Sequence, residues 1–412
     1  MLNQLRDEMK QPAGRAAMIA LAILGLLWVG LVAGDWGMRV RWFQWHRSLI
    51  QGPARPTYMG YATPLSTNHV PARRGGDLLP MIGVPSLMER YAEPIPAYTQ
   101  INDEYGLPNE PPVTPGKFPV VMVGDSYLAQ GGDWSNRLAG LLSVRLGCPV
   151  YTVSMAGLGP VMPLTAFMDH PVYREYPPRV VVWDIIERDI GGPYFEGMLF
   201  NVLQRTRTNQ VATTAAAVGP VNWRELGATR LRARLPETSL AAQLARRVWA
   251  RLRYHLFGLI VPEVFISSEP VLGRDMLFYY GSLTPRCWGA SIRDLPRVTR
   301  TISDANEAYF KPRGIHWVIL LIPDKETIYE EYVPPAAFPC GVPPPPSCLT
   351  ELEERLRAAG LTVVNLLPAY REAALAGRLL YGHNDTHWNR EGMALAADQL
   401  AGPVLELLAE EP

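Results

Sequence analysis

The stretch FPVVMVGDSY, residues 118–127, decides the fold of this chain. Its first part is a short apolar, β-branched run with the length of a fully buried strand. The run stops at Gly124 and delivers Ser126 immediately after the strand. Ligands of open α/β sheets gather outside the carboxyl ends of the strands. A serine at this position is therefore a candidate to act on a substrate.

The segments on both sides of this stretch alternate between strand and helix patterns. The patterns predict strands over 149–157, 178–186, 315–322 and 361–366, and helices over 134–146, 349–360 and after Asn389. Such alternation is typical of a parallel sheet covered by helices. We therefore expect an α/β domain over 116–405.

A second motif near the end supplies the remaining parts of a nucleophilic triad. Asp385 and His387 stand two residues apart in the stretch NDTHW. His387 would accept the proton of Ser126, and Asp385 would orient the imidazole. Either motif alone is weak evidence, because Gly-Asp-Ser is a common turn and Asp-x-His occurs by chance. His383 is the alternative base, although it lacks an Asp-x partner.

The N-terminal part predicts a membrane anchor. Residues 16–34 carry no charge, and their length as a helix approaches the roughly 30 Å of a bilayer core. A cleaved signal peptide is the alternative, but its apolar region is usually shorter, about 7–15 residues. We expect residues 1–15 in the cytoplasm and an uncleaved single-pass anchor in the inner membrane. Basic residues flank both ends of the span, so they do not decide its orientation.

Two further regions differ from the α/β pattern. Residues 35–115 are rich in Pro, Gly and Tyr with little periodicity, which predicts an extended linker. Residues 195–290 form an Arg-rich insertion. Within it, residues 240–262 predict either a helix that covers the sheet or a basic amphipathic helix that docks on a membrane or partner. The two cases differ in whether Trp249, Leu252, Leu256 and Phe257 are buried against the sheet or left exposed.

The cysteines favour an oxidising compartment. Cys340 and Cys348 bracket a Pro-rich loop that suits a short disulfide, although two unrelated thiols remain an alternative. Cys148 and Cys287 form a second pair or are simply buried. We expect the bulk of the chain to be periplasmic or otherwise extracytoplasmic.

The two motifs together resemble the SGNH (GDSL-type) hydrolase superfamily, whose fold is a flavodoxin-like three-layer α/β/α sandwich. Three phrases are similar to the alginate-type polysaccharide O-acetyltransferases, which are periplasmic or membrane-anchored: VVWDIIER at 181–188, IPDK at 322–325 and DTHWN at 385–389. The similarity covers about 118–192 and 314–405.

The chain departs from this resemblance in two respects. In the alginate enzymes the Asp-x-His-Trp block precedes the serine block, whereas here the serine comes first. The superfamily also usually supplies an oxyanion-hole asparagine from a Gly-x-Asn-Asp motif, which this sequence lacks. We therefore expect the oxyanion to be bound by the backbone N–H of Ser126 and that of Gly157 or Gly159, where glycine allows close approach.

Other polar residues are weaker candidates. Tyr127, Arg188, Lys325 and Trp388 are candidates for substrate contact; Arg188 could instead pair with Glu187 at a strand end. His316 lies in an apolar strand and is expected to be a satisfied core histidine. No His/Cys cluster has metal-ligand spacing, and no Gly-rich phosphate loop occurs. We expect neither a metal nor a cofactor.

These features predict an enzyme that moves an acyl group, most simply acetyl, onto or off a carbohydrate hydroxyl through an acyl-serine. The resemblance implies a multispan membrane acyltransferase as donor partner. Lys+Arg and Asp+Glu number 39 each, which does not favour nucleic-acid binding. The alternative function is a non-catalytic subunit that keeps the fold as a scaffold and docks onto a larger membrane complex.

Overall fold

The structure is a computed structural model of the chain. It describes residues 65–109, 116–130, 132–157, 159–190, 264–287, 294–338 and 346–410, except residue 83, together with the isolated residues 25–26, 29–30, 114, 195, 248–249 and 252. All but residues 25–26, 29–30, 248–249 and 252 fall in one compact unit, formed by Thr57–Ala217 and Ile260–Pro412. This unit contains the sheet and both triad motifs.

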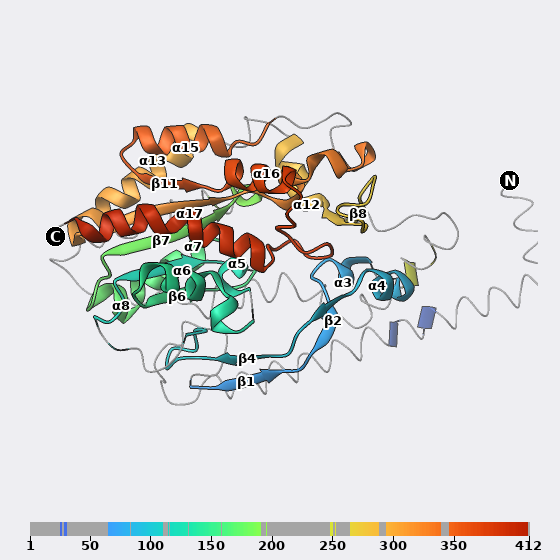
Figure 1. Ribbon diagram of the computed structural model, residues 1–412, viewed down its shortest axis with the longest axis horizontal. Helices are drawn as coiled ribbons and strands as arrows, with labels where there is room; N and C mark the ends of the chain where they lie inside the picture. The colour runs from blue at the N-terminus through green and yellow to red at the C-terminus, as the bar shows by residue number, and fades with distance from the viewer. Residues whose placement is uncertain are drawn as a thin grey trace, which may run out of the picture. The chain divides into compact units, whose positions relative to one another are not determined.

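A five-stranded parallel sheet forms the centre of the unit (Figure 1). Its strand order is β11-β10-β7-β5-β6, and every neighbouring pair is parallel. The strands are β5 (Val120–Gly124), β6 (Val150–Ser154), β7 (Val180–Ile186), β10 (His316–Ile322) and β11 (Thr362–Asn365). The predicted parallel sheet is confirmed, with each strand about one to four residues shorter than its sequence pattern.

Helices cover both faces of this sheet. On one side α6 (Leu138–Leu146) packs against the long C-terminal helix α17 (Arg390–Ala409), and both lie in front of the sheet in Figure 1. Right-handed crossovers place α7 (Val161–Asp169), α13 (Leu295–Ala305) and α15 (Leu349–Ala358) on the other side. After β5 the chain adds β6 on one side, and it then adds β7, β10 and β11 on the other side. At such a switch in strand order a crevice is expected at the carboxyl ends of the strands.

An aromatic stack fixes the far face of the sheet. Trp183 on β7 stacks on Trp317 of β10 with ring centroids 5.2 Å apart, and Trp317 stacks on Phe310 at 4.3 Å. The indole N–H of Trp183 donates to the Pro160 carbonyl just before α7, at 2.8 Å. Since side chains alternate along a strand, the neighbouring Asp184 points to the opposite face, where its Oδ1 accepts a hydrogen bond from Asp125 N at 3.3 Å.

Several further short elements surround this sandwich. They are the helices α5 (Ser126–Ala129), α8 (Pro171–Arg174), α12 (Tyr280–Cys287), α14 (Lys325–Ile328) and α16 (Leu367–Leu375), and the hairpin strands β8 (Val264–Ile266) and β9 (Leu277–Tyr279).

Residues 65–109 differ from the extended linker that their composition suggests. They form two antiparallel pairs, β1 (Thr67–Val70) with β4 (Tyr98–Ile101) and β2 (Arg73–Gly75) with β3 (Glu93–Ile95), and the helices α3 (Leu79–Ile82) and α4 (Pro85–Tyr91). The pairs are too short to show a hydrophobic period. Side-chain hydrogen bonds join this segment to the rest of the unit, among them the one from Thr99 N to Asp133 Oδ1 at 2.9 Å.

One such contact protects the outer edge of the sheet. The Asn109 side chain accepts a hydrogen bond from Thr152 N at 2.9 Å and donates to Thr152 O at 2.9 Å. It therefore occupies the position that a further strand would take beside β6, and an edge strand without such cover is open to unwanted pairing.

Several predictions fall outside the described residues. Of the expected anchor at 16–34, only Gly25, Leu26, Val29 and Gly30 are described; they are helical and exposed. Within the part of the chain that the structure describes, no helix has the length and apolar character needed to cross a membrane.

The insertion and the cysteines are described only in part. Trp249 and Leu252 are helical and exposed, whereas Leu256 and Phe257 lie outside the described residues. Cys340 is also outside them, so its bond to Cys348 stays a prediction. Cys148 is a free cysteine, and the alternative Cys148–Cys287 pair is not formed.

Candidate active site

Ser126 lies at the carboxyl end of β5, where the strand turns into the short helix α5. Asp125 caps this turn by accepting a hydrogen bond from Tyr127 N at 2.9 Å, while its own backbone N–H donates to Asp184 Oδ1 at 3.3 Å. Gly124 is required by sterics, since a Cβ at this position would lie 1.7 Å from Asp184 Oδ1. The serine therefore projects from a turn that the central strands hold in place.

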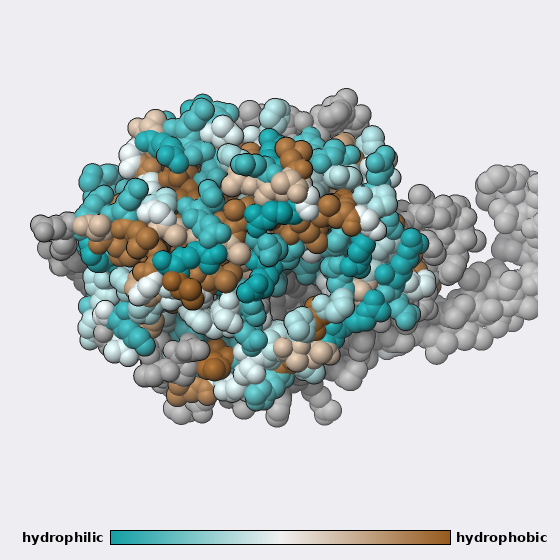
Figure 2. Space-filling model, in the orientation of Figure 1, coloured by the Kyte–Doolittle hydropathy of each residue, from teal (hydrophilic) through white to brown (hydrophobic). Residues whose placement is uncertain are grey.

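The structure brings the three predicted triad side chains together. His387 Nε2 lies 2.8 Å from Ser126 Oγ, although 261 residues separate them in sequence. His387 Nδ1 lies 2.6 Å from Asp385 Oδ1. Both distances are within the reach of a nucleophile, a base and an orienting carboxylate. In Figure 2 the surface is hollowed between the start of α17 and the α3–α4 segment, and hydrophilic residues border the hollow.

A second carboxylate, Asp77, also contacts the imidazole and was missed by sequence reasoning. Asp77 Oδ2 lies 3.4 Å from His387 Nδ1. The same carboxylate accepts hydrogen bonds from Thr386 N at 2.8 Å and Thr386 Oγ1 at 2.5 Å. In return, Asp77 N donates to Asp385 Oδ2 at 3.2 Å. Asp77 and Asp385 are 308 residues apart, so no local spacing could reveal the pair.

The two carboxylates change the titration of the histidine. Burial of His387 opposes its charged form, but the hydrogen bonds and charges of Asp385 and Asp77 outweigh burial and raise its pKa from 6.5 to about 9. For Asp77, burial acts to raise the pKa, yet the contacts with His387 and Thr386 outweigh it and lower the pKa to about 2. The two carboxylates therefore favour the charged form of His387.

Hydrogen bonds to buried polar side chains hold the loop that carries His387 in place. Lys325 Nζ donates to the carbonyls of Asp385 at 2.8 Å and Gly382 at 3.2 Å. Tyr127 Oη donates to the Thr386 carbonyl at 2.7 Å, and the indole N–H of Trp388 donates to the Tyr127 carbonyl at 3.0 Å. Tyr127, the residue after the nucleophile, therefore bonds to the residues on both sides of His387 in the sequence.

These positions differ from the expectation of substrate contact. Tyr127 and Lys325 are fully buried, and Trp388 is 3% exposed. Burial lowers the pKa of Lys325, although the acidic groups near it act to raise the value. The three side chains are directed inward because each satisfies a buried backbone group of the catalytic loops. In this structure they support the site.

Arg188 pairs with Asp324 rather than with Glu187. Its Nη1 donates to Asp324 Oδ1 at 2.8 Å and to Tyr127 Oη at 3.2 Å, and its side chain is 17% exposed. Glu187 instead accepts from Thr327 Oγ1 at 2.6 Å and from Asp324 N at 3.2 Å. The expected ion pair between Arg188 and Glu187 is therefore replaced by one between Arg188, which follows β7, and Asp324, which follows β10.

The expected oxyanion donors lie on adjacent turns. Gly157 and Gly159 stand three and five residues after the end of β6 at Ser154, and both have positive φ, 72° and 64°. The turn is tied to the serine turn because Met155 N donates to Gly124 O at 3.0 Å. No asparagine follows β7, where Glu187 and Arg188 begin a short 3₁₀ turn. Backbone N–H groups are therefore the candidate donors.

His383 and His316, the two other histidines weighed from the sequence, are engaged elsewhere. His383 Nδ1 lies 3.1 Å from Glu93 Oε1, and its Nε2 lies 3.2 Å from the Val271 carbonyl, so neither ring nitrogen is placed to accept a proton from the serine. His316 begins β10 half-buried, with Nε2 3.6 Å from Glu410 Oε2, and is therefore not the core histidine that its strand suggests.

Asp77, Asp385 and His387 could also offer ligands to a metal ion, since one atom from each lies within 4.8 Å of the others. The imidazole atom available to such an ion is Nδ1, the atom already shared by both carboxylates. Metal binding at Nδ1 would displace the proton that the carboxylates hold. The donor set therefore fits a charge-stabilised histidine better than a metal centre.

The parallel sandwich with a serine after its first central strand and Asp-x-His before its last helix defines an SGNH hydrolase-like protein. The chain belongs to the family described as "SGNH hydrolase-like domain, acetyltransferase AlgX", whose sequence model matches residues 59–187 and 277–411. These segments contain Asp77, Ser126, Asp385 and His387. They also contain most of the N-terminal segment that composition alone assigns to a linker.

Individual relatives are more distant. A probable alginate O-acetylase AlgJ from Pseudomonas fluorescens is 25% identical over 169 residues, which is 40% of this chain and 39% of that protein. A probable alginate O-acetylase AlgJ from Azotobacter vinelandii is 36% identical over 70 residues, 17% of each chain. The matched regions thus span well under half the length of these relatives.

Among solved structures, a carbohydrate esterase family 2 enzyme with a carbohydrate-binding domain from Corynascus thermopiles (Myceliophthora fergusii) aligns with a TM-score of 0.32. The alignment has 11% identity and covers 77% of this chain and 73% of the other. A TM-score this low is too weak to support an argument.

Proposed function

We propose that this protein transfers an acetyl group to a carbohydrate hydroxyl, or removes one, through an acetylated Ser126. The observation that carries the proposal is the continuous contact from Ser126 Oγ to His387 at 2.8 Å and on to Asp385 at 2.6 Å. Membership in a family described as acetyltransferase supports the acyl group. The AlgJ relatives, each named a probable alginate O-acetylase, support a polysaccharide acceptor.

The first half-reaction forms the acyl-enzyme. Neutral His387 takes the proton from Ser126 Oγ as this oxygen bonds to the carbonyl carbon of the donor. The carbonyl oxygen becomes an oxyanion, which the backbone N–H groups near Ser126, Gly157 and Gly159 would stabilise. When the tetrahedral species collapses, the donor oxygen leaves with the proton that His387 returns. Asp385 and Asp77 stabilise the imidazolium throughout.

The second half-reaction reverses these roles. A sugar hydroxyl loses its proton to His387 and attacks the acetyl carbon, and Ser126 Oγ recovers the proton when it leaves. Water in place of the sugar would give hydrolysis. The same residues therefore serve a transferase and an esterase, and the difference lies in which nucleophile reaches the acyl-enzyme first.

The membrane topology and the donor belong to the same proposal. The charge-free stretch at 16–34 supports an inner-membrane anchor, with the catalytic unit outside the cytoplasm. Acetyl groups would then have to cross the membrane, and a multispan membrane acyltransferase is a fitting donor partner. A reporter fused after residue 412 that is active only in the cytoplasm would contradict this topology.

Labelling by a serine-directed fluorophosphonate tests the enzymatic proposal. The wild-type protein should be labelled at Ser126 and should hydrolyse p-nitrophenyl acetate. Ser126→Ala should lose labelling and about 10⁴-fold or more of kcat. Ser135→Ala, which removes an exposed serine outside the site, is the matched control and should behave as wild type.

The same experiment addresses the non-catalytic alternative. A folded wild-type protein that is neither labelled nor active, and that Ser126→Ala leaves unchanged, would favour a scaffold. The absence of the oxyanion asparagine is the feature that favours this outcome, since loss of one such donor typically lowers the rate about 10²–10³-fold.

A further inference from the structure

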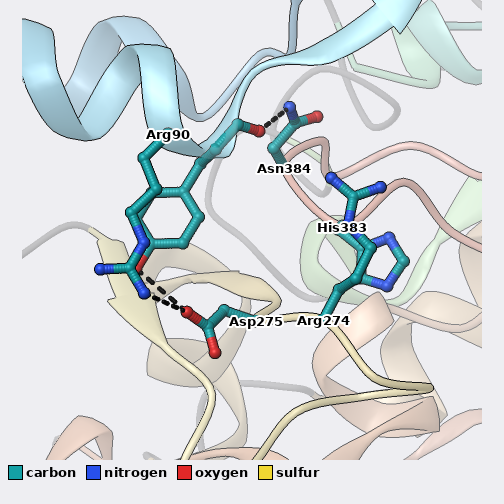
Figure 3. A pocket seen from close by; sticks show the side chains of 6 residues that line it. Arg90, Arg274, Asp275, His383 and Asn384 are labelled. Carbon is teal, nitrogen blue, oxygen red and sulfur yellow. Dashed lines mark hydrogen bonds and ion pairs between the residues drawn. The ribbon is translucent and has the colours of Figure 1, made fainter.

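A second pocket lies beside the loop that carries the triad histidine, and no triad residue lines it (Figure 3). Its volume is about 140 Å³. Its lining comes from α4, from the turn before β9 and from the loop before His387: Arg90, Tyr91, Arg274, Asp275, His383 and Asn384. Three segments far apart in sequence thus meet at one small polar cavity.

Two arginines present hydrogen-bond donors to this pocket. Arg90 Nη2 donates to Asp275 Oδ2 at 3.1 Å, and Arg274 Nη1 donates to Glu93 Oε1 at 2.9 Å. Their side chains remain 64% and 53% exposed. A guanidinium carries five N–H donors, so each arginine retains donors for a ligand. In Figure 3 the Arg90 side chain lies on one side of the pocket and the side chains of Arg274 and His383 on the other.

The pocket also presents an acceptor, Asp275, and Glu93 beside the lining offsets the charge of the second arginine. Asp275 accepts from both Arg90 and Tyr91 Oη, the latter at 3.3 Å, and its side chain is 30% exposed. Each guanidinium is already faced by one carboxylate. A lining of this kind, with donors and acceptors side by side and little net charge, suits a ligand with several hydroxyl groups better than a strong anion.

The size of the pocket limits what can enter it. Pockets for drug-sized ligands and cofactors measure about 300–1,000 Å³, which excludes a nucleotide. A cavity of about 150 Å³ accommodates benzene, a single six-membered ring. A volume of about 140 Å³ therefore corresponds to one ring, and the remainder of a larger ligand would lie outside.

The pocket shares its wall with the catalytic loop. Asn384 Nδ2 donates to the Tyr91 carbonyl at 2.6 Å and to the Gly75 carbonyl at 2.8 Å, and Asp77 stands two residues after Gly75. His387 follows Asn384 by three residues, a chain length that spans at most about 10 Å. A short run of linked sugar rings can cover such a separation.

We propose that this pocket binds one neutral, hydroxyl-bearing sugar ring of an oligosaccharide whose neighbouring unit reacts at Ser126. The inference rests on the proposed function for the reaction, but the pocket's binding of a sugar can be measured without it. Asp275 and the two guanidinium groups would hold the ring hydroxyls, and Arg90, the most exposed of them, is the variant least able to disturb the fold.

Binding is tested first in the Ser126→Ala background, so that no turnover occurs. Titration calorimetry with neutral hexa-oligosaccharides of glucose, mannose and xylose should show saturable binding to at least one series. Arg90→Ala in the same background should weaken it about tenfold, the loss expected for a hydrogen bond to a charged group. Arg300→Ala, an exposed arginine on α13, is the matched control and should bind as the parent does.

Three results would overturn the proposal. They are binding of inorganic phosphate or glucuronate without any neutral series, neutral binding that Arg90→Ala leaves unaltered, and no binding of any oligosaccharide. Turnover is measured separately. The ratio of kcat/KM for acetylated oligosaccharides to kcat/KM for p-nitrophenyl acetate should be lower in Arg90→Ala than in the wild type. If wild type and Ser126→Ala both lack esterase activity while sugar binding persists, the proposed reaction is wrong and the pocket stands.

Discussion

The nucleophile and the base reach the active site by different means. Ser126 follows β5, which hydrogen-bonds to a strand on each side, so backbone ladders fix its position. His387 stands in an irregular loop that is held by side chains, among them Asp77 from the N-terminal segment and Lys325 from α14. A sheet positions the serine, whereas a network of hydrogen bonds positions the histidine.

This difference indicates where the site tolerates change. The serine side depends on close packing, because Gly124 leaves no room for a Cβ beside Asp184. The histidine side depends on charge and on polar groups that must all be satisfied. Substitutions on the two sides should therefore have different effects. Larger side chains around the serine should lower the free energy of unfolding. Changes of polar groups around the histidine should alter kcat and its pH dependence.

The largest effect is expected from the carboxylate nearest the imidazole. Asp385→Asn should lower kcat by about 10²–10⁴, since the corresponding change in a serine protease triad costs about 10⁴ and Asp77 can compensate in part. Asp77→Asn should cost about tenfold because its oxygen is more distant, 3.4 Å against 2.6 Å. Steady-state kinetics with p-nitrophenyl acetate measures both.

The double variant then tests whether the two carboxylates act together. A coupled pair predicts non-additive losses in a double-mutant cycle, and simple additivity would show that Asp77 acts independently of Asp385. Asp398→Asn, an exposed carboxylate on α17 that pairs with Arg145, is the matched control and should leave kcat unchanged.

On the serine side, Gly124→Ala should lower the free energy of unfolding by about 3 kcal/mol or more, because overpacking a closed site typically costs about 1–3 kcal/mol and occasionally more. Gly402→Ala is the matched control. Nothing lies within 4 Å of a Cβ at Gly402 in the exposed part of α17. Gly402→Ala should therefore raise the free energy of unfolding by about 0.5–1 kcal/mol. Denaturant titration compares the two variants, and equal stabilities would mean that the Asp184 side chain can turn away from the added methyl group.

Lys325→Met probes the polar support of the histidine loop. The variant leaves the carbonyls of Gly382 and Asp385 without their buried donor, which should lower the free energy of unfolding by about 2–4 kcal/mol and reduce kcat. Lys311→Met removes an exposed ion pair with Glu307 and should change stability by less than about 0.5 kcal/mol. A stable but inactive Lys325→Met would show that the lysine orients the loop without stabilising the fold.

The smallest effect concerns pH. His387 must be neutral to act as base, and its pKa is about 9, so kcat/KM should rise with pH and level off only above about 9. Asp77→Asn should move this limb toward lower pH, because one of the groups that holds the proton is gone. An unshifted limb would mean that Asp385 alone sets the pKa of His387.

The same shift has a consequence for stability. Because the pKa in the folded state lies above the ordinary 6.5, the imidazolium contributes fully below pH 6.5, and the contribution is lost as pH rises through about 9. Melting temperatures of wild type should therefore fall between these values, and those of Asp77→Asn should fall over a narrower range.

The sequence predicted the parts of the site that have a local signature. The β-branched run before Ser126 and the Asp-x-His spacing are short patterns with a physical cause, and the apolar runs of 178–186 and 315–322 predict two further strands of the sheet. Composition predicts a linker over 35–115, and the strands within residues 65–109 escape this prediction because they are three or four residues long. Strands of that length show no hydrophobic period, and their place depends on partners far away in the chain.

Local patterns are enough to predict the α/β architecture and to identify the serine, the histidine and one aspartate. The second aspartate, Asp77, joins them across 308 residues through folding alone. Folding also turns Tyr127, Lys325 and Trp388 inward, where they support the site. Periodicity and motif spacing follow from local backbone geometry, whereas a buried polar network depends on which segments the fold brings within about 3 Å of one another.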